Sequence, residues 1–132
     1  MQDYVATGFP SPATDFEERL DLNRHLIANE TASYIVRAGS LSMLDAGIDM
    51  GDELIIDKSI SPKCRNIVVV NFNGDFTCKR LMIEGEGKHK RIWFKAENAA
   101  EPERYKNIYP KPGDSVILWG VVTYTLKNML HC

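Results

Sequence analysis

Beyond Thr31, the sequence breaks into short apolar runs separated by turn-forming residues. Runs of this length are typical of β-strands, and the Gly, Pro, Asn and Asp residues between them favour turns. The runs cover residues 34–36, 53–57, 67–70, 76–78, 91–94, 116–118 and 121–124. The turn signals include Gly51-Asp52, Asn73-Gly74 and the segment 110–113. This succession predicts a mainly β domain with six or seven short strands.

Asn73-Gly74 is the sharpest of these turn signals. The apolar run before it ends at Val70, and the next one begins at Phe76. Asn and Gly both tolerate the positive φ angles that a two-residue hairpin turn requires. The sequence therefore predicts a β-hairpin at this point.

The N-terminal region has a different composition. Residues 1–14 contain Gly8, Pro10 and Pro12 among small polar residues, which favours extended backbone. From Asp15, acidic residues in the first turn and apolar residues near helical spacing predict one amphipathic helix of about three to four turns. We expect a flexible N-terminal arm over residues 1–14 and a folded domain over residues 15–132.

Length and charge limit the class of protein. The 132 residues suffice for one domain. Sixteen Lys+Arg against eighteen Asp+Glu give a formal net charge of −2, which argues against direct, sequence-specific DNA binding as the main activity. The longest apolar stretch, residues 116–122, is shorter than the roughly 18 residues of a membrane-spanning helix. We therefore expect no membrane segment. Three cysteines without paired spacing suggest reduced thiols, which indicates a cytoplasmic protein.

Histidine and metal chemistry have little support in the sequence. The histidines are scattered, at His25, His89 and His131. No paired-cysteine, zinc-protease or calcium-loop motif is present, so we expect no metal and no cofactor. Asp45, Asp52 and Asp57 fit turn chemistry and solvent exposure better than a metal site.

A serine can act without histidine if a buried lysine serves as its base, because burial lowers the pKa of a lysine. Ser42 follows a predicted strand and begins what resembles a helical turn, where free backbone N–H groups point to one spot. Lys79 and Arg80 follow the predicted hairpin turn and face opposite sides of their strand, and periodicity does not say which is buried. A helix cap at Ser42 and a solvated lysine at Lys79 remain open alternatives.

Five blocks in one order resemble a known family: GFPSPATDF, LDLN, SMLDAGI, GDELIID and FTCKRL. Together they are similar to the UmuD family of error-prone-repair proteins, relatives of the self-cleaving C-terminal domain of the LexA repressor. The resemblance runs collinearly from Gly8 to the C-terminus. It implies a LexA C-terminal or signal-peptidase-like β domain, with one N-terminal helix after an extended arm.

The resemblance also implies a serine peptidase that cuts its own arm. The positions matching the family's Ser–Lys dyad are Ser42, as nucleophile, and Lys79, as general base. The matching scissile bond is Thr7–Gly8, and the backbone N–H groups of Ser42 and Leu41 would hold the oxyanion.

Two positions differ from the family's usual pattern. Thr7 stands where members usually have Cys or Ala, and Ser40 stands where they usually have Gly. The segment before Gly8 is also only seven residues long, close to the processed form of family members.

By resemblance, the partners are a second copy in a homodimer, a UmuC-like Y-family DNA polymerase for translesion synthesis, and a RecA filament on single-stranded DNA that stimulates cleavage. An alternative is a cleavage-poor binding module that acts only as a polymerase accessory subunit. A further alternative is a signal-peptidase-like enzyme acting on other proteins.

Two other features have simpler interpretations. The basic segment 88–91, near Trp93 and Phe94, fits a solvated hairpin turn better than a nucleic-acid contact. Trp119 and its apolar neighbours are typical of a core or a dimer interface.

Overall fold

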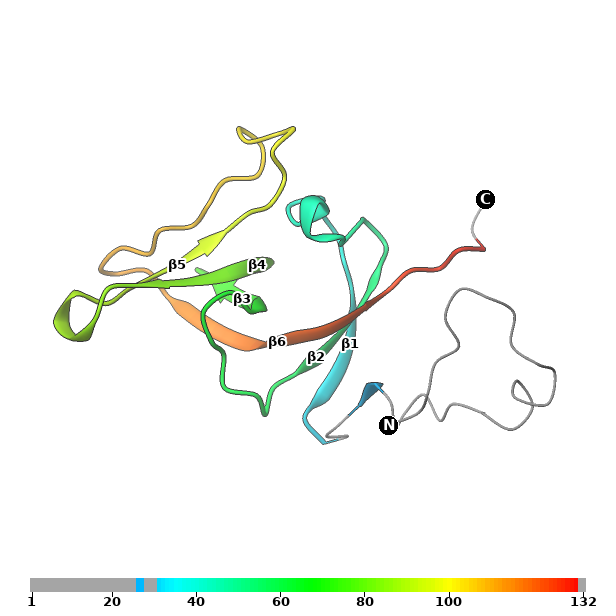
Figure 1. Cartoon of the computed structure of the whole chain (residues 1–132), viewed down its shortest axis with the longest axis horizontal. Helices are drawn as coiled ribbons and strands as arrows, with labels where there is room; N and C mark the ends of the chain where they lie inside the picture. Colours follow the sequence, from blue (N-terminus) through cyan, green and yellow to red (C-terminus); the bar gives the residue numbers. More distant parts are fainter. Residues whose placement is uncertain (1–25, 28–30, 131–132) are drawn as a thin grey trace, which may run out of the picture.

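The computed structural model describes residues 26–27 and 31–130. Within this part of the chain, six strands form one antiparallel sheet in the order β1-β2-β6-β3-β4-β5 (Figure 1). The strands are β1 (Ser33–Arg37), β2 (Glu53–Asp57), β3 (Ile67–Phe72), β4 (Asp75–Glu84), β5 (Arg91–Lys95) and β6 (Val116–Leu126). Two short 3-10 turns complete the elements, η1 (Leu44–Ala46) and η2 (Gly87–His89).

The mainly β prediction is confirmed. Each predicted apolar run lies in a strand, and the last two runs form the single long strand β6. The predicted arm, most of the predicted helix and the predicted scissile bond Thr7–Gly8 lie outside the described residues.

The predicted hairpin joins β3 and β4. Phe72 pairs with Asp75 across the turn, so Asn73 and Gly74 are the two loop residues. Their φ angles are +51° and +94°. Both are positive, as the tightest hairpin turns require, which explains why Asn-Gly occupies this position.

The core consists of two apolar clusters, because successive residues of β3 point to opposite faces of the sheet. Val69 belongs to the first cluster, and its neighbours Val68 and Val70 belong to the second. The other buried members of the first cluster are Met43, Ile48, Leu54 and Ile56. The other buried members of the second cluster are Leu81, Phe94 and Val121.

An irregularity in β6 orients one large side chain. β3 residues Val69 and Val70 pair with Gly120 and Leu118, so Trp119 is an extra residue between two ladder pairs. Such a bulge redirects the side chain of the inserted residue. Trp119 is partly buried and packs against the first cluster, as expected for a core position.

The three aspartates singled out above occupy different environments. Asp45 is exposed, as predicted. Asp52 is buried and accepts the Asp49 N–H at 2.8 Å, which agrees with turn chemistry. The predicted solvent exposure of Asp57 is wrong, since Asp57 is 4% exposed. Its carboxylate accepts hydrogen bonds from the backbone and side chain of Ser59, which satisfy it inside the fold.

Neither a cluster that could hold a metal ion nor a helix that could span a membrane is found in the part of the chain that the structure describes. Its His, Cys, Asp and Glu side chains form no group of three or more that could hold a metal ion. Its helical segments include none with the length and apolar character needed to cross a membrane.

Candidate active site

Ser42 lies in the turn between β1 and η1, which we call the serine turn (residues 39–43). Ser42 is 2% exposed, and the next residue, Met43, belongs to the first core cluster. The backbone carbonyl of Ser42 accepts a hydrogen bond from the Glu97 N–H at 2.7 Å. The serine turn is therefore held by the core on one side and by the segment after β5 on the other.

The segment after β5 also connects the serine turn to β4. The Asn98 side-chain amide donates to the Leu41 carbonyl at 2.8 Å. The Glu97 carboxylate accepts two hydrogen bonds from the Arg80 guanidinium, at 2.7 and 2.9 Å. A bidentate pair of this kind fixes geometry as well as adding energy. Because Arg80 directly follows Lys79, these contacts fix the serine turn relative to the lysine.

Lys79 lies inside the fold. It is 6% exposed, so Lys79 is the buried member of the Lys79–Arg80 pair. Its ammonium donates to Thr77 Oγ1 at 2.7 Å and to the Cys78 carbonyl at 3.5 Å. Burial lowers the pKa of Lys79 below its ordinary value of 10.5, because a charged amine is poorly solvated there. A lysine with a lowered pKa can serve as a base.

Ser42 and Lys79 meet at one backbone carbonyl. The Ser42 hydroxyl donates to the Cys78 carbonyl oxygen at 3.2 Å, and Lys79 uses the same acceptor. Among the described residues, the two side chains share this acceptor and make no direct hydrogen bond to each other. Catalytic hydrogen bonds are often long or poorly aligned until substrate binds. The arrangement is therefore compatible with a nucleophile and its base at rest.

The Cys78 thiol is a poor competitor for the role of nucleophile. Burial raises its pKa to about 11, against the opposing effect of the nearby Lys79 and Arg80 charges. The thiolate is the reactive form of cysteine. At neutral pH this thiol stays protonated, so Cys78 takes part in the site through its backbone carbonyl.

Ser40 makes two contacts with Ser42. Its hydroxyl donates to Ser42 Oγ at 3.2 Å and accepts a hydrogen bond from the Ser42 N–H at 3.3 Å. Both distances are longer than the usual values for such bonds. Ser40 itself is exposed, so its hydroxyl reaches the buried Ser42 from the surface.

A groove of about 540 Å³ leads to Ser42. It runs between the end of β1 with the serine turn and the start of β4, and part of β6 contributes to its wall. Its lining residues include Val36, Ser40, Ser42, Phe76, Cys78 and Trp119. Trp119 thus lines the groove as well as packing on the core, with its ring 5.2 Å from that of Tyr34. The mostly apolar lining suits an extended peptide segment.

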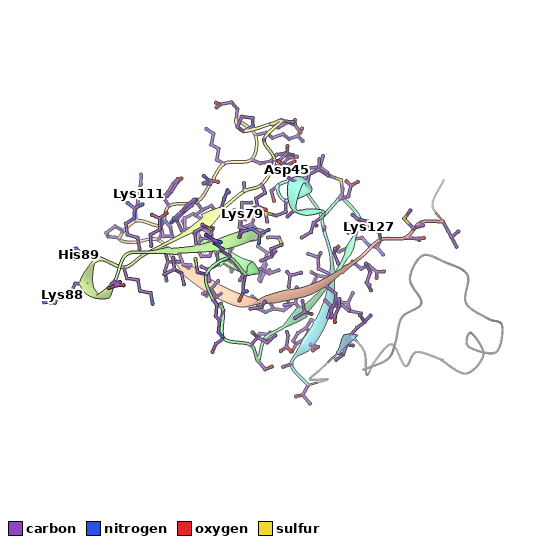
Figure 2. All side chains as sticks on the ribbon, in the orientation of Figure 1. Asp45, Lys79, Lys88, His89, Lys111 and Lys127 are labelled. Atoms are coloured by element: carbon purple, nitrogen blue, oxygen red, sulfur yellow. The ribbon has the colours of Figure 1, made fainter. Side chains whose placement is uncertain are left out.

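The basic segment 88–91 lies far from this site. Figure 2 shows Lys88 and His89 at the tip of the β4–β5 hairpin, away from Lys79. Phe94 is fully buried in the second core cluster and is not part of an exposed basic patch. This agrees with a solvated hairpin turn.

The sequence predicted Ser42 and Lys79 as site residues but not the residues that hold them in place. Thr77 lies two positions before Lys79 in β4, so strand alternation puts both side chains on one face and could have identified this partner. Glu97 and Asn98 carry no local signal, because they follow β5 and contact the serine turn only in the folded chain.

Comparison with known proteins agrees with the resemblance noted in the sequence. The Peptidase S24-like family model matches residues 1–123. Protein ImpA of Salmonella typhimurium is 34% identical over 96% of this chain and 81% of its own length. Protein SamA of Salmonella typhimurium strain LT2 is 38% identical, over 88% of this chain and 75% of its own length. Protein MucA of Escherichia coli is 35% identical, over 97% of this chain and 83% of its own length. The chain therefore belongs to the Peptidase S24 family and is a homologue of its UmuD-like members.

Proposed function

We propose that this protein is a UmuD-like SOS mutagenesis protein that cuts its own N-terminal arm with Ser42 and Lys79. The observation that carries the proposal is that these two buried side chains, from distant segments, share the Cys78 carbonyl beside an apolar groove. Family membership supports it, because the Peptidase S24 family includes self-cleaving serine peptidases such as LexA.

In the proposed reaction, neutral Lys79 takes the hydroxyl proton as Ser42 Oγ attacks the carbonyl carbon of Thr7. The bond to the Gly8 nitrogen breaks, and the Lys79 ammonium returns its proton to the leaving amine. Residues 1–7 remain as an ester on Ser42. Water then attacks the ester while Lys79 accepts a proton, which passes to Ser42 Oγ as the ester bond breaks. The backbone N–H groups of Ser42 and Leu41 stabilise the oxyanion in both steps.

The groove offers a place for the arm beside the start of β4. β5 pairs with β4 only from Arg80 to Glu84, so among the described strands none pairs with the start of β4 on that side. This stretch, Phe76 to Cys78, lines the groove. An extended segment can add to an unpaired strand edge through backbone hydrogen bonds. We expect the proline-containing arm to lie there in extended form, with the Thr7 carbonyl at Ser42.

The partners follow from the same proposal. The processed chain forms a homodimer and joins a UmuC-like Y-family polymerase for translesion synthesis, and a RecA filament on single-stranded DNA stimulates the cut. UmuD-family homologues support the general SOS mutagenesis setting.

The pH dependence of cleavage tests the role of Lys79. Only the neutral amine can accept a proton, so the cleavage rate of the wild-type chain should rise between about pH 6 and about pH 10. Because burial lowers the pKa of Lys79, the rise should level off below the ordinary lysine pKa of 10.5. Lys79→Ala should show no cleavage at any pH, whereas Lys63→Ala, at an exposed position, should follow the wild-type profile. A flat wild-type profile would contradict a lysine base.

A second function is favoured by one contact. The Ser40 hydroxyl already accepts a hydrogen bond from the Ser42 N–H, the donor that a substrate oxygen would use. This contact favours a cleavage-poor binding module that serves only as a polymerase accessory subunit. The intact mass of the full chain distinguishes the two functions. Loss of residues 1–7 indicates the self-cleaving protein, and an unchanged mass indicates the binding module.

A further inference from the structure

The side chain of Ser40 occupies a distinctive position beside Ser42. A substrate carbonyl attacked by Ser42 must bring its carbon to Ser42 Oγ and its oxygen to the Ser42 N–H. The Ser40 hydroxyl oxygen lies 3.2 Å from that Oγ and 3.3 Å from that nitrogen. The Ser40 oxygen is therefore close to both of the groups that the substrate carbonyl must approach.

We propose that the Ser40 hydroxyl occupies the oxyanion position of the resting protein and slows self-cleavage. The inference rests on the proposed function of Ser42. Ser40 acts in two ways. Its oxygen accepts a hydrogen bond from the Ser42 N–H, which the oxyanion needs as a donor. Its hydroxyl also donates a hydrogen bond to Ser42 Oγ, which engages a lone pair of the nucleophile.

The contacts make Ser40 a brake on cleavage without preventing it. Both hydrogen bonds are long, and a hydrogen bond of this kind contributes little to stability. The Ser40 side chain is exposed, and rotation about its χ1 angle to another staggered rotamer moves the hydroxyl away from Ser42. An arriving carbonyl therefore displaces the hydroxyl at a modest cost, which lowers the rate by about 3- to 10-fold.

The geometry also separates this effect from the role of Lys79. Ser40 makes no hydrogen bond to Lys79 among the described residues, and the lysine donates to Thr77 and the Cys78 carbonyl. Removing the Ser40 hydroxyl should therefore change the cleavage rate without changing the pH at which that rate is half-maximal.

The test compares Ser40→Ala and Ser40→Gly with the wild-type full chain. Intact mass measures two rates. The first is the loss of residues 1–7, and the second is the labelling of Ser42 by a fluorophosphonate. The phosphoryl oxygen of this reagent needs the same oxyanion-binding N–H groups as a substrate carbonyl. Both variants should be faster than wild type by about 3- to 10-fold in both assays, with an unchanged pH midpoint. Ser61→Ala removes an exposed serine outside the groove lining and should match wild type.

The results that would contradict the Ser40 inference differ from those that would contradict the proposed function. If the wild-type chain cuts and is labelled at Ser42, while both Ser40 variants are equal or slower, the Ser40 inference is wrong and the proposed function stands. A slower rate with a shifted pH midpoint would mean that Ser40 positions the dyad instead. If Ser42 is inert in every chain, including the Ser40 variants, the proposed function fails and the inference fails with it.

Discussion

A lysine inside a β domain affects stability as well as chemistry. Lys79 is almost fully buried, and its pKa is lowered below 10.5 because burial penalises the charged form. Between the lowered pKa and 10.5, the unfolded chain binds more protons at this residue than the folded chain does. The contribution of Lys79 to the free energy of unfolding therefore becomes more favourable as the pH rises through this range.

Lys79→Met should make the chain more stable at about pH 7, by about 1 kcal/mol, because it removes a buried charge and keeps a long apolar side chain. The difference from wild type should shrink as the pH approaches 10.5, since the wild-type lysine then loses its proton and its penalty. Urea unfolding at about pH 7 and about pH 10 measures this. Lys63→Met, at an exposed position, is the control. A difference that grows with pH would contradict a buried, destabilising ammonium.

At the scale of elements, β6 connects the two halves of the sheet. It pairs with β2 on one side and β3 on the other, and both pairings shift register along its length. Gly120 lies at the shift in the β3 pairing, and its Cα faces Ile56 of β2. A Cβ added there would lie 2.4 Å from Ile56 Cγ2, and Ile56 is fully buried, so the contact has little room to relax. Glycine at this position allows β6 and β2 to approach closely.

Gly120→Ala should lower the free energy of unfolding by about 1–3 kcal/mol, because it overpacks the core beside Ile56. Gly39→Ala is the matched control, since an added Cβ at Gly39 meets nothing within 4 Å and the glycine has no positive φ. Thermal or urea unfolding of both variants gives the comparison. Equal stabilities for the two would show that the approach of β6 to β2 is not tight.

The elements also explain how far the sequence could predict this protein. Strand positions and the Asn73-Gly74 hairpin depend on local patterns, and both are confirmed. The buried face of β4 depends on which side of the sheet the core covers, so alternation alone left Lys79 and Arg80 undecided. Asp57 appeared solvated because sequence gives no sign that Ser59 turns back to satisfy it.

At the scale of the whole molecule, the candidate site draws on three separate segments. The serine turn, the start of β4 and the segment after β5 meet only when the sheet is complete. The Ser42 contact with Cys78 spans 36 positions, and the Asn98 contact with Leu41 spans 57. Such contacts follow from the order of strands in the sheet, which explains why local patterns made Ser42 and Lys79 candidates but only the family resemblance paired them.

The intact masses of the full wild-type and Ser42→Ala chains, after incubation with RecA filaments on single-stranded DNA and nucleotide, test the central claim most directly. Ser42 is a small buried side chain, so its alanine variant should fold, which a far-UV spectrum and unfolding curve check. We predict that the wild-type chain loses residues 1–7 and that Ser42→Ala stays whole. A Ser42→Ala chain that is still cut between Thr7 and Gly8, or a wild-type chain that stays intact even at raised pH, would contradict self-cleavage by Ser42 and Lys79.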